Sequence, residues 1–160
     1  MHNATQSNTL VNGRCHGNKC TADKAIDGDK ATYSYTKYWR DSASWSVELS
    51  STVNIKKILF TTSDISLMKG YFNRFKVETR VISSEPWKIC RGEYLVKGSP
   101  TLLIAQCQNE TIAGHLRLSV SGMRVQLILG EVKVIGSVAG NFSCKHNFRN
   151  NTLEDFRRYT

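Results

Sequence analysis

Hydrophobic and polar residues alternate in many short segments of the chain, with the period of two that is typical of a β-strand with one buried face. In the segment 115–120 the alternate positions are Leu116, Leu118 and Val120. Similar alternation or short apolar runs predict further strands at 45–49, 55–62, 72–81, 94–96, 102–107, 125–129 and 132–135. No segment has the period of a convincing amphipathic helix. The pattern therefore predicts an all-β sandwich of about eight strands.

The same alternation assigns the buried faces of two of these strands. Trp45 begins a strand in which apolar residues alternate with polar ones, so we expect it in the core. Within 72–81, Phe75 and Val77 fall on one face, with Thr79 as the next candidate.

Length and composition are those of one globular domain. A chain of 160 residues, 40% hydrophobic and 22% charged, is long enough for one core and short for two. No apolar run approaches the ~18 residues of a membrane-spanning helix. After Gly140 the composition shifts to Asn, Arg and Lys around Cys144. We predict a domain at 1–137 and a basic tail or linker at 138–160.

Five cysteines and several N-glycosylation sequons indicate an oxidising, extracellular environment. Met1 precedes polar residues instead of an apolar stretch, so we expect any signal peptide to have been removed. The chain is predicted to be secreted, or to be the extracellular part of a cell-surface protein. The sequons stand at Asn3, Asn109, Asn141 and Asn150.

The net charge of +9 allows two interpretations. It favours acidic partners such as sulfated glycans, sialylated surfaces or anionic membranes, and it equally fits a basic surface without such a partner. Nucleic acid is disfavoured, because no basic segment is interleaved with aromatic residues and the chain carries signs of secretion. The four histidines are scattered and no nucleophile turn is recognisable, so we predict no enzyme.

Cys15 and Cys20 enclose a short polar segment that contains His16. A partial zinc site is one interpretation, but zinc needs a fourth ligand at a suitable spacing, and we find none in the sequence. A small Cys15–Cys20 disulfide loop is favoured in an oxidising compartment.

The segment 21–29 leads from an apolar step into a turn that carries carboxylates at Asp27 and Asp29. Gly28 allows a tight turn because glycine takes positive φ at no steric cost. Carboxylates in such a turn, with backbone carbonyls, form an oxygen-rich pocket that suits calcium, and Glu131 is available as one more ligand. A plain solvated turn is the alternative, since turns of this composition are common.

Five segments stand in a recognisable order, and they are Asn3–Ser7, Ala25–Asp29, Trp45–Leu49, Ile55–Ile58 and Gly130–Gly136. In this order they resemble the fucolectin-like (F-type lectin) domains, which are relatives of the discoidin domains of coagulation factors. The resemblance covers roughly residues 3 to 137. It implies a jelly-roll β-sandwich of the galactose-binding-domain type, calcium beside the turn, and fucose held by loops at one end. It also places Asn3 in an early strand, so Asn109, Asn141 and Asn150 are the predicted glycosylation sites.

The resemblance implies a structural calcium ion. We predict Asp27, Asp29 and Glu131 as ligands, together with carbonyls from around Lys24 and Thr32. Lys24 stands where the family usually offers an asparagine. A nearby ammonium would weaken the site or replace the ion, whereas the change is harmless if the family's ligand there is a backbone carbonyl.

The groups with which the family holds fucose are replaced in this chain. The family's histidine falls near Tyr35, its first arginine near Ser63 or Asp64, and its second arginine near Tyr71. Where a guanidinium should donate to sugar hydroxyls, an aspartate offers only acceptors. The chain is therefore a divergent member by this resemblance.

The cysteines follow the family only in part. A bridge frequent in the family is missing, because its two positions correspond to about Tyr33 and Gly130. A second family bridge implies a Cys90–Cys107 disulfide. Cys144 is then left over, which predicts a covalent dimer through Cys144 or a chain that is a piece of a longer protein.

We predict a non-catalytic recognition or adhesion module that binds a cell-surface protein first and a glycan other than fucose second. Binding residues belong on loops at one end of the sandwich, here 15–20, 33–41 and 63–71. Aromatic and Arg side chains suit a macromolecular ligand. The predicted ligand-binding residues are Tyr33, Tyr35, Tyr38, Trp39, Arg40, Asp64, Lys69 and Tyr71.

Two alternative functions stay open. One is a lectin of the fucose or galactose type. The other is a discoidin-like binder of anionic membrane surfaces, with Ile65, Leu67 and Met68 as an apolar spike beside Lys69. The spike is absent if Leu67 and Met68 fold back into the core.

Overall fold

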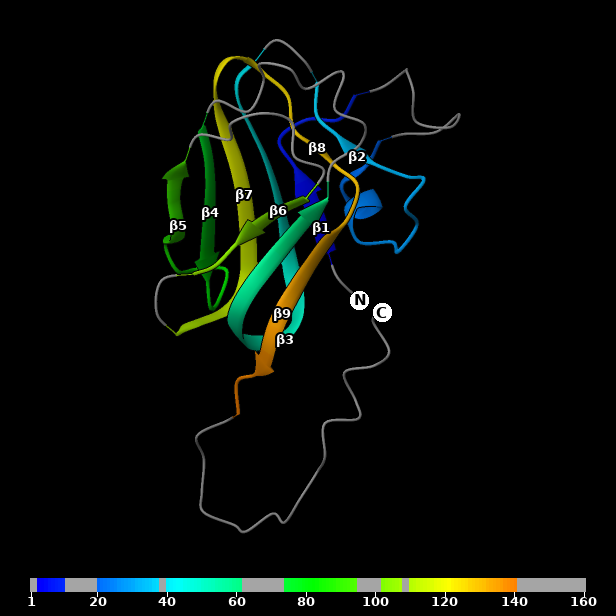
Figure 1. Cartoon of the computed structure of the whole chain (residues 1–160). Coiled ribbons are helices and arrows are strands. Elements are labelled where there is room, and N and C mark those ends of the chain that lie inside the picture. Colours follow the sequence, from blue (N-terminus) through cyan, green and yellow to red (C-terminus); the bar gives the residue numbers. More distant parts are fainter. Residues whose placement is uncertain are drawn as a thin grey trace.

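The computed structural model describes residues 3–10, 20–37, 40–61, 74–94, 102–107 and 110–140 (Figure 1). Their strands are β1 (Asn3–Gln6), β2 (Ser34–Tyr35), β3 (Arg40–Thr61), β4 (Arg74–Arg80), β5 (Lys88–Tyr94), β6 (Leu102–Ala105), β7 (Thr111–Val125), β8 (Ile128–Leu129) and β9 (Val132–Val138). One 3-10 helix, η1, spans Ala22–Ala25. These ranges contain no α-helix, and no helix in them is long and apolar enough to cross a bilayer. The all-β prediction is confirmed.

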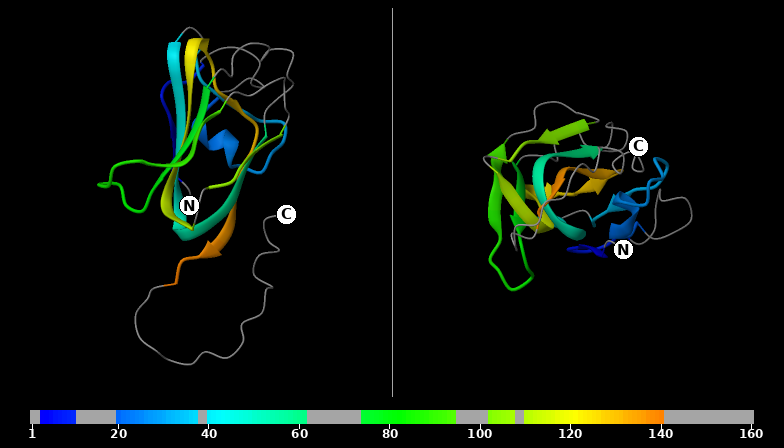
Figure 2. Two further views of the ribbon diagram at one scale, coloured as in Figure 1. Left: turned by 60° about the vertical axis from the view of Figure 1, so that its left-hand side comes forward. Right: turned by 90° about the horizontal axis from the view of Figure 1, so that it is seen from below.

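Strand β3 takes part in both layers of the sandwich. Its first half pairs with β1 and β7, and from β7 the sheet continues through β4 to β5. Its second half pairs with β6 on one side and with β9 on the other. Figure 2 shows the two layers facing each other. The register with β7 shifts between Glu48 and Val53, as at a β-bulge, which is how a single strand bends from one layer into the other.

The core lies between the layers and contains the side chains that the alternation assigned to it. Trp45, Phe75, Val77, Thr79, Leu116, Leu118 and Val120 are all buried. The rings of Phe60 and Phe75 meet edge to face, with centroids 5.4 Å apart. Aromatic pairs prefer this geometry, which adds about 0.5–1.5 kcal/mol to their burial.

Several details differ from the sequence-based expectations. The strand predicted at 125–129 is divided between the end of β7 and β8. The predicted strands at 45–49 and 55–62 are parts of one strand, because the backbone of 50–54 stays extended through the register shift. The loop expected at 33–41 contains β2, and β3 already begins at Arg40. Of the strand predicted at 94–96, Tyr94 ends β5, and residues 95 and 96 lie outside the described residues. The earlier part of β5 was not predicted, because Lys88, Ile89 and Arg91 are exposed at the margin of the sheet and leave no apolar alternation.

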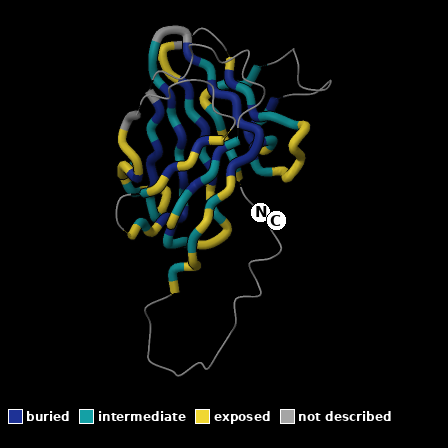
Figure 3. Tube along the Cα trace, viewed as in Figure 1, coloured by how far each residue is buried: buried dark blue, intermediate teal, exposed yellow. Residues whose placement is uncertain are grey.

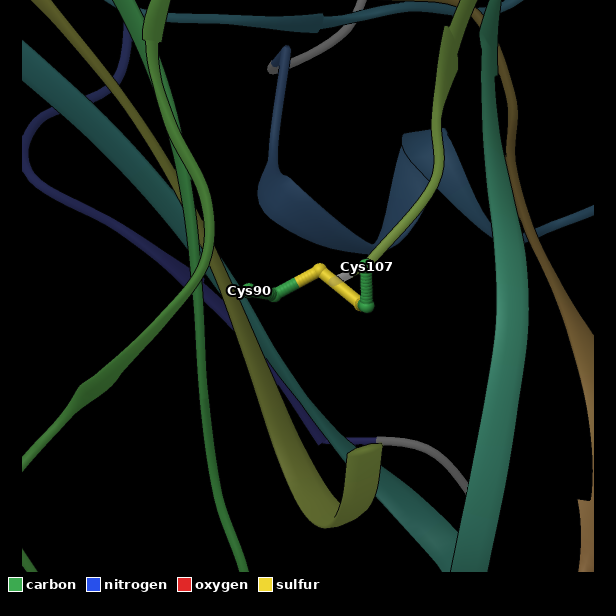
Figure 4. Close-up of a disulfide and its surroundings, with 2 residues drawn as sticks. All are labelled: Cys90 and Cys107. Atoms are coloured by element: carbon green, nitrogen blue, oxygen red, sulfur yellow. A yellow bond between two sulfur atoms is a disulfide. The ribbon is translucent and has the colours of Figure 1, made fainter. Parts of the chain in front are cut away.

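The Cys90–Cys107 disulfide is present and joins β5 to the residues that follow β6 (Figure 4). The prediction taken from the resemblance is therefore confirmed. Closing a loop of this sequence separation, 17 residues, stabilises a fold by about 3 kcal/mol in the chain-entropy model. Cys20 is also disulfide-bonded, whereas Cys15 and Cys144 lie outside the described residues.

The domain boundary at 137 stays a prediction. Strand β9 ends at Val138, whose Cα is paired with Val53. The segment 141–160 lies outside the described residues, so the tail or linker stays a prediction.

Candidate functional site

The turn that carries Asp27 and Asp29 is fastened directly to the core. Helix η1 precedes the turn, and its Ala25 is fully buried. The indole Nε1 of Trp45 donates a hydrogen bond of 2.9 Å to the carbonyl of Ala22. Because Trp45 is itself fully buried, this bond ties helix η1, and with it the turn, to the core.

Within the turn, the Asp27 carboxylate receives several hydrogen bonds. Its Oδ1 accepts the backbone N–H of Asp29 at 3.0 Å, and the Thr32 hydroxyl lies 2.9 Å from both of its oxygens. Gly28 has a φ of +79°, which only glycine adopts without strain. The positive φ that the sequence predicted for this tight turn is confirmed.

Other oxygens converge on the same hydroxyl. The Thr32 Oγ1 lies 3.1 Å from the carbonyl oxygen of Asp29 and 3.5 Å from that of Lys24. We call the Asp27 carboxylate, the Thr32 hydroxyl and these two carbonyls the oxygen cluster. A hydroxyl has a single proton to donate, so it satisfies one of these acceptors at a time. Donors other than the hydroxyl also reach the cluster, because the Asp29 N–H and the Lys24 ammonium bind the Asp27 carboxylate and the Thr32 N–H donates to the Asp29 carbonyl at 3.1 Å.

Glu131 approaches the turn from the start of β9. Two hydrogen bonds join Glu131 to Thr61. The Glu131 N–H donates to Thr61 Oγ1 at 2.7 Å, and the Thr61 N–H donates to the Glu131 carbonyl at 2.8 Å. The backbone N–H of Gly28 favours the ionised form of the Glu131 carboxyl and so acts to lower its pKa. Glu131 is only 8% exposed. Its Oε1 is buried and has no hydrogen-bond partner among the described residues.

The electrostatics of Glu131 favour a positive charge nearby. Burial raises the pKa of this carboxyl, and the negative charges of Asp27 and Asp29 raise it further against the opposing Gly28 hydrogen bond and Lys133 charge. A buried oxygen without a donor, next to other carboxylates, is a position that a cation would stabilise.

Lys24 places its ammonium on the other side of the turn. Its Nζ lies 3.2 Å from Asp27 Oδ2 and 3.8 Å from Asp23 Oδ2. The hydrogen bond to Asp27 raises the pKa of Lys24. Burial alone would raise the pKa of Asp27, but the bonds from Asp29, Thr32 and Lys24 together lower it. Lys24 thus neutralises part of the charge of Asp27.

The predicted calcium ligands come together only in part. Asp29 contributes its carbonyl to the oxygen cluster, whereas its carboxylate turns away and accepts the N–H of Ala31 at 2.8 Å. In the described part of the chain, no three His, Cys, Asp or Glu side chains form a metal-binding group. The oxygen set is thus mainly one of carbonyl and hydroxyl groups around Asp27, and calcium stays a prediction.

Two of the predicted ligand-binding tyrosines pack within the domain. A Cβ atom at Gly130 would lie 3.4 Å from the ring of Tyr33, so this ring covers the Gly130 backbone. These are the two positions that the resemblance to F-type lectin domains aligned with a missing disulfide. Tyr35 lies in β2, paired with Ile128 of β8, and is half-buried.

The other predicted sites lie outside the described residues. They are Tyr38, Trp39, the side chain of Arg40, Asp64, Ile65, Leu67, Met68, Lys69, Tyr71, Asn109, Asn141 and Asn150. Their roles therefore stay predictions.

The sequence reasoning missed a second charged cluster, on the outer face of the first layer. Glu78 is 5% exposed and accepts from Arg117 Nε at 2.8 Å and from Lys76 Nζ at 3.0 Å. Arg80 and Arg117 lie over the ring of Trp87, with distances of 4.3 and 4.4 Å to its centroid. This cluster could have been found only from the pairing of Glu78 with Arg117 across β4 and β7. That pairing cannot be predicted without the register of the two strands.

Comparison with known proteins identifies a fold. No protein-family model matches the chain, and no curated protein matches it in sequence. Among solved structures, the chain is similar to CpGH89CBM32-5 from Clostridium perfringens, in complex with GalNAc-β-1,3-galactose. The TM-score is 0.69 at 20% identity, over 84% of this chain and 95% of that one.

Two further solved structures have the same sandwich. The lectin domain of lectinolysin, complexed with Lewis b antigen, matches with a TM-score of 0.68 and 20% identity, over 85% of this chain and 93% of that one. A Ruminococcus gnavus GH29 fucosidase in complex with fucose matches with a TM-score of 0.64 and 18% identity, and the chain spans 25% of its length. At such identities the likeness establishes a galactose-binding-like β-sandwich.

Proposed function

We propose that the chain is a non-catalytic carbohydrate-recognition module of the F-type lectin kind, which works outside the cell or at its surface. The supporting observation is the near-complete overlap with two sandwich domains solved with bound saccharides, of which the chain covers 95% and 93%. The chain spans only a quarter of the fucosidase, so we do not propose fucosidase activity.

The proposed contact surface is the loop end next to the oxygen cluster. Tyr33 and Tyr35 pack against Gly130 and β8, so we do not count them among the ligand contacts. The residues expected to touch the ligand are then Tyr38, Trp39, Asp64, Lys69 and Tyr71. Aromatic rings stack on sugars and Asp64 accepts from hydroxyls, so the proposed ligand is a glycan other than fucose. A cell-surface protein is the second candidate, because Tyr and Trp also form interface hot spots.

We also propose calcium as a structural ion at the oxygen cluster. Carboxylate, hydroxyl and carbonyl oxygens are the ligands that calcium prefers, and the cluster gathers all three kinds of oxygen around Thr32. Asp27, Thr32 and the carbonyls of Lys24 and Asp29 would hold the ion, with Glu131 supplying its unpartnered oxygen. Bound calcium would neutralise these carboxylates and brace the turn against the start of β9.

A glycan array tests the function. The labelled chain is applied with and without calcium to an array that includes GalNAc-β-1,3-galactose and Lewis b. We expect binding to a glycan without fucose, and loss of that binding in Trp39→Ala. Trp87→Ala is the matched control, because it removes the same side chain from the arginine pair on the first layer and should bind like the parent.

Other outcomes would change the proposal in defined ways. Fucose-selective binding would show that the lectin site has been kept, through residues not named above. No binding to any glycan, with capture of a protein from surface-labelled cells that Trp39→Ala abolishes, would replace the glycan by a protein partner. Equal loss in both tryptophan variants would refute the proposed loop surface.

A further inference from the structure

Two strands of the second layer expose aliphatic side chains on their outer face. Leu102 and Ile104 of β6 are 46% and 53% exposed, and Ile135 of β9 is 38% exposed. These positions alternate with more buried ones along both strands, as Figure 3 shows. A single exposed aliphatic residue is ordinary, whereas a contiguous apolar patch marks a site of contact with a protein or a membrane.

The register of the strands makes the exposed residues one patch. Leu59 of β3 is paired with Ile104 on one side and with Lys133 on the other. Lys57 of β3 is paired with Ile135 of β9. Residues directly opposite each other in antiparallel strands lie on the same face. We call this patch the outer strip, and its residues are Lys57, Leu59, Leu102, Ile104, Lys133 and Ile135.

The outer strip is basic as well as apolar. The three segments that form it, 55–61, 102–105 and 132–138, contain three lysines and no Asp or Glu. None of the ion pairs in the described part of the chain involves Lys57 or Lys133. A second copy of the chain would bring these lysines face to face, so charge complementarity requires an anionic occupant.

We infer that the outer strip rests on a lipid bilayer that carries anionic headgroups. Aliphatic side chains flanked by lysines have the composition of surfaces that lie in a membrane interface. Each lysine near an anionic leaflet strengthens binding about five-fold. Protein interfaces are instead enriched in Tyr, Trp and Arg and depleted in Lys. The strip has no aromatic ring on which a sugar could stack. This site is separate from the loop end proposed for glycan binding.

Vesicle sedimentation in the presence of a chelator tests the inference without any contribution from calcium. The parent chain should sediment with phosphatidylcholine vesicles that contain phosphatidylserine, and salt should weaken this binding. Ile104→Ser with Ile135→Ser should abolish it. Ile82→Ser with Ile89→Ser is the matched control, because both residues are exposed aliphatics on the β4–β5 hairpin. That control should sediment like the parent.

Charge is tested by a second matched pair of variants. Lys57→Gln with Lys133→Gln should weaken binding about 25-fold, at about five-fold for each lysine. Lys37→Gln with Lys88→Gln removes two exposed lysines elsewhere and should have little effect. Absence of sedimentation, equal binding to phosphatidylcholine alone, or equal losses in strip and control variants would overturn the inference. A parent dimer that Ile104→Ser with Ile135→Ser converts to a monomer would also overturn it, because the strip would then join two chains.

Discussion

Glu78 and Glu131 are two buried carboxylates in opposite situations. Glu78, on the outer face of the first layer, has both oxygens paired with Arg117 and Lys76. Glu131, beside the turn, keeps one buried oxygen without a partner among the described residues. Their pKa values move in opposite directions. Burial opposes ionisation of both, but the two cations lower the pKa of Glu78, whereas neighbouring carboxylates raise that of Glu131.

The difference separates a structural ion pair from a candidate ligand site. A buried carboxylate that is paired with two cations of its own chain has its charge balanced and its oxygens hydrogen-bonded, so its role is structural, within the sheet. One that faces other acidic groups leaves an unbalanced charge in the fold. Such an imbalance is tolerated where an external cation completes the site, which is why we propose calcium near Glu131 and not near Glu78.

The largest expected effect comes from breaking the satisfied pair. Arg117→Ala should destabilise the domain by about 2–3 kcal/mol, because it leaves the Glu78 carboxylate short of its strongest hydrogen bond. It also removes one guanidinium from the ring of Trp87. Urea unfolding measures the change. The double variant Glu78→Gln with Arg117→Ala should be less destabilised than Arg117→Ala alone. A loss no greater than that of Lys88→Ala, an exposed position, would contradict this account.

The next effect concerns the unsatisfied carboxylate. Calcium at about 100 times its Kd should stabilise the parent domain by about 2.7 kcal/mol, seen as a higher Tm than in chelator. Glu131→Gln should lose most of this response, because it removes a charged ligand. Glu78→Gln should keep it while being less stable. A parent melt unchanged by chelation would mean that the Lys24 ammonium has taken the place of the ion.

A pH series should separate the two regions further. The pKa of Glu78 in the folded domain lies below its usual value of 4.5, so the folded state favours its ionised form. Its contribution to stability is therefore present above that usual value and is lost as the pH falls through the lowered pKa. In chelator, urea unfolding between neutral pH and about pH 3 should show a smaller acid loss in Glu78→Gln than in the parent. Parallel curves would contradict the assignment.

The smallest expected effect is that of the internal cation. Lys24→Gln should bind calcium modestly more tightly than the parent, because no ammonium then competes for Asp27. The change is small because the pair is partly exposed and solvent screens it. Lys30→Gln, an exposed lysine in the same turn, is the matched control, and titration calorimetry compares their affinities. Weaker binding in Lys24→Gln than in Lys30→Gln would show that the lysine supports the site.

The sequence alone determined the features that depend on near neighbours. The alternation at 115–120 identified a strand and its buried face, because successive side chains of a strand point to opposite sides. The glycine between two aspartates identified the turn, because positive φ is a local preference. Trp45 and Phe75 were placed in the core for the same reason, as large apolar residues on the buried face of a strand.

The tertiary structure alone decided which distant residues meet. The continuity of β3 across the register shift, the short β2 inside the loop expected at 33–41, and the contact of Tyr33 with Gly130 all require strand pairing over long sequence separations. The same holds for the pairing of Glu78 with Arg117 and for the Glu131 oxygen that has no partner in the described part of the chain. Two carboxylates that look alike in sequence differ in charge balance because register, which no local pattern contains, assigns cations to one and acidic neighbours to the other.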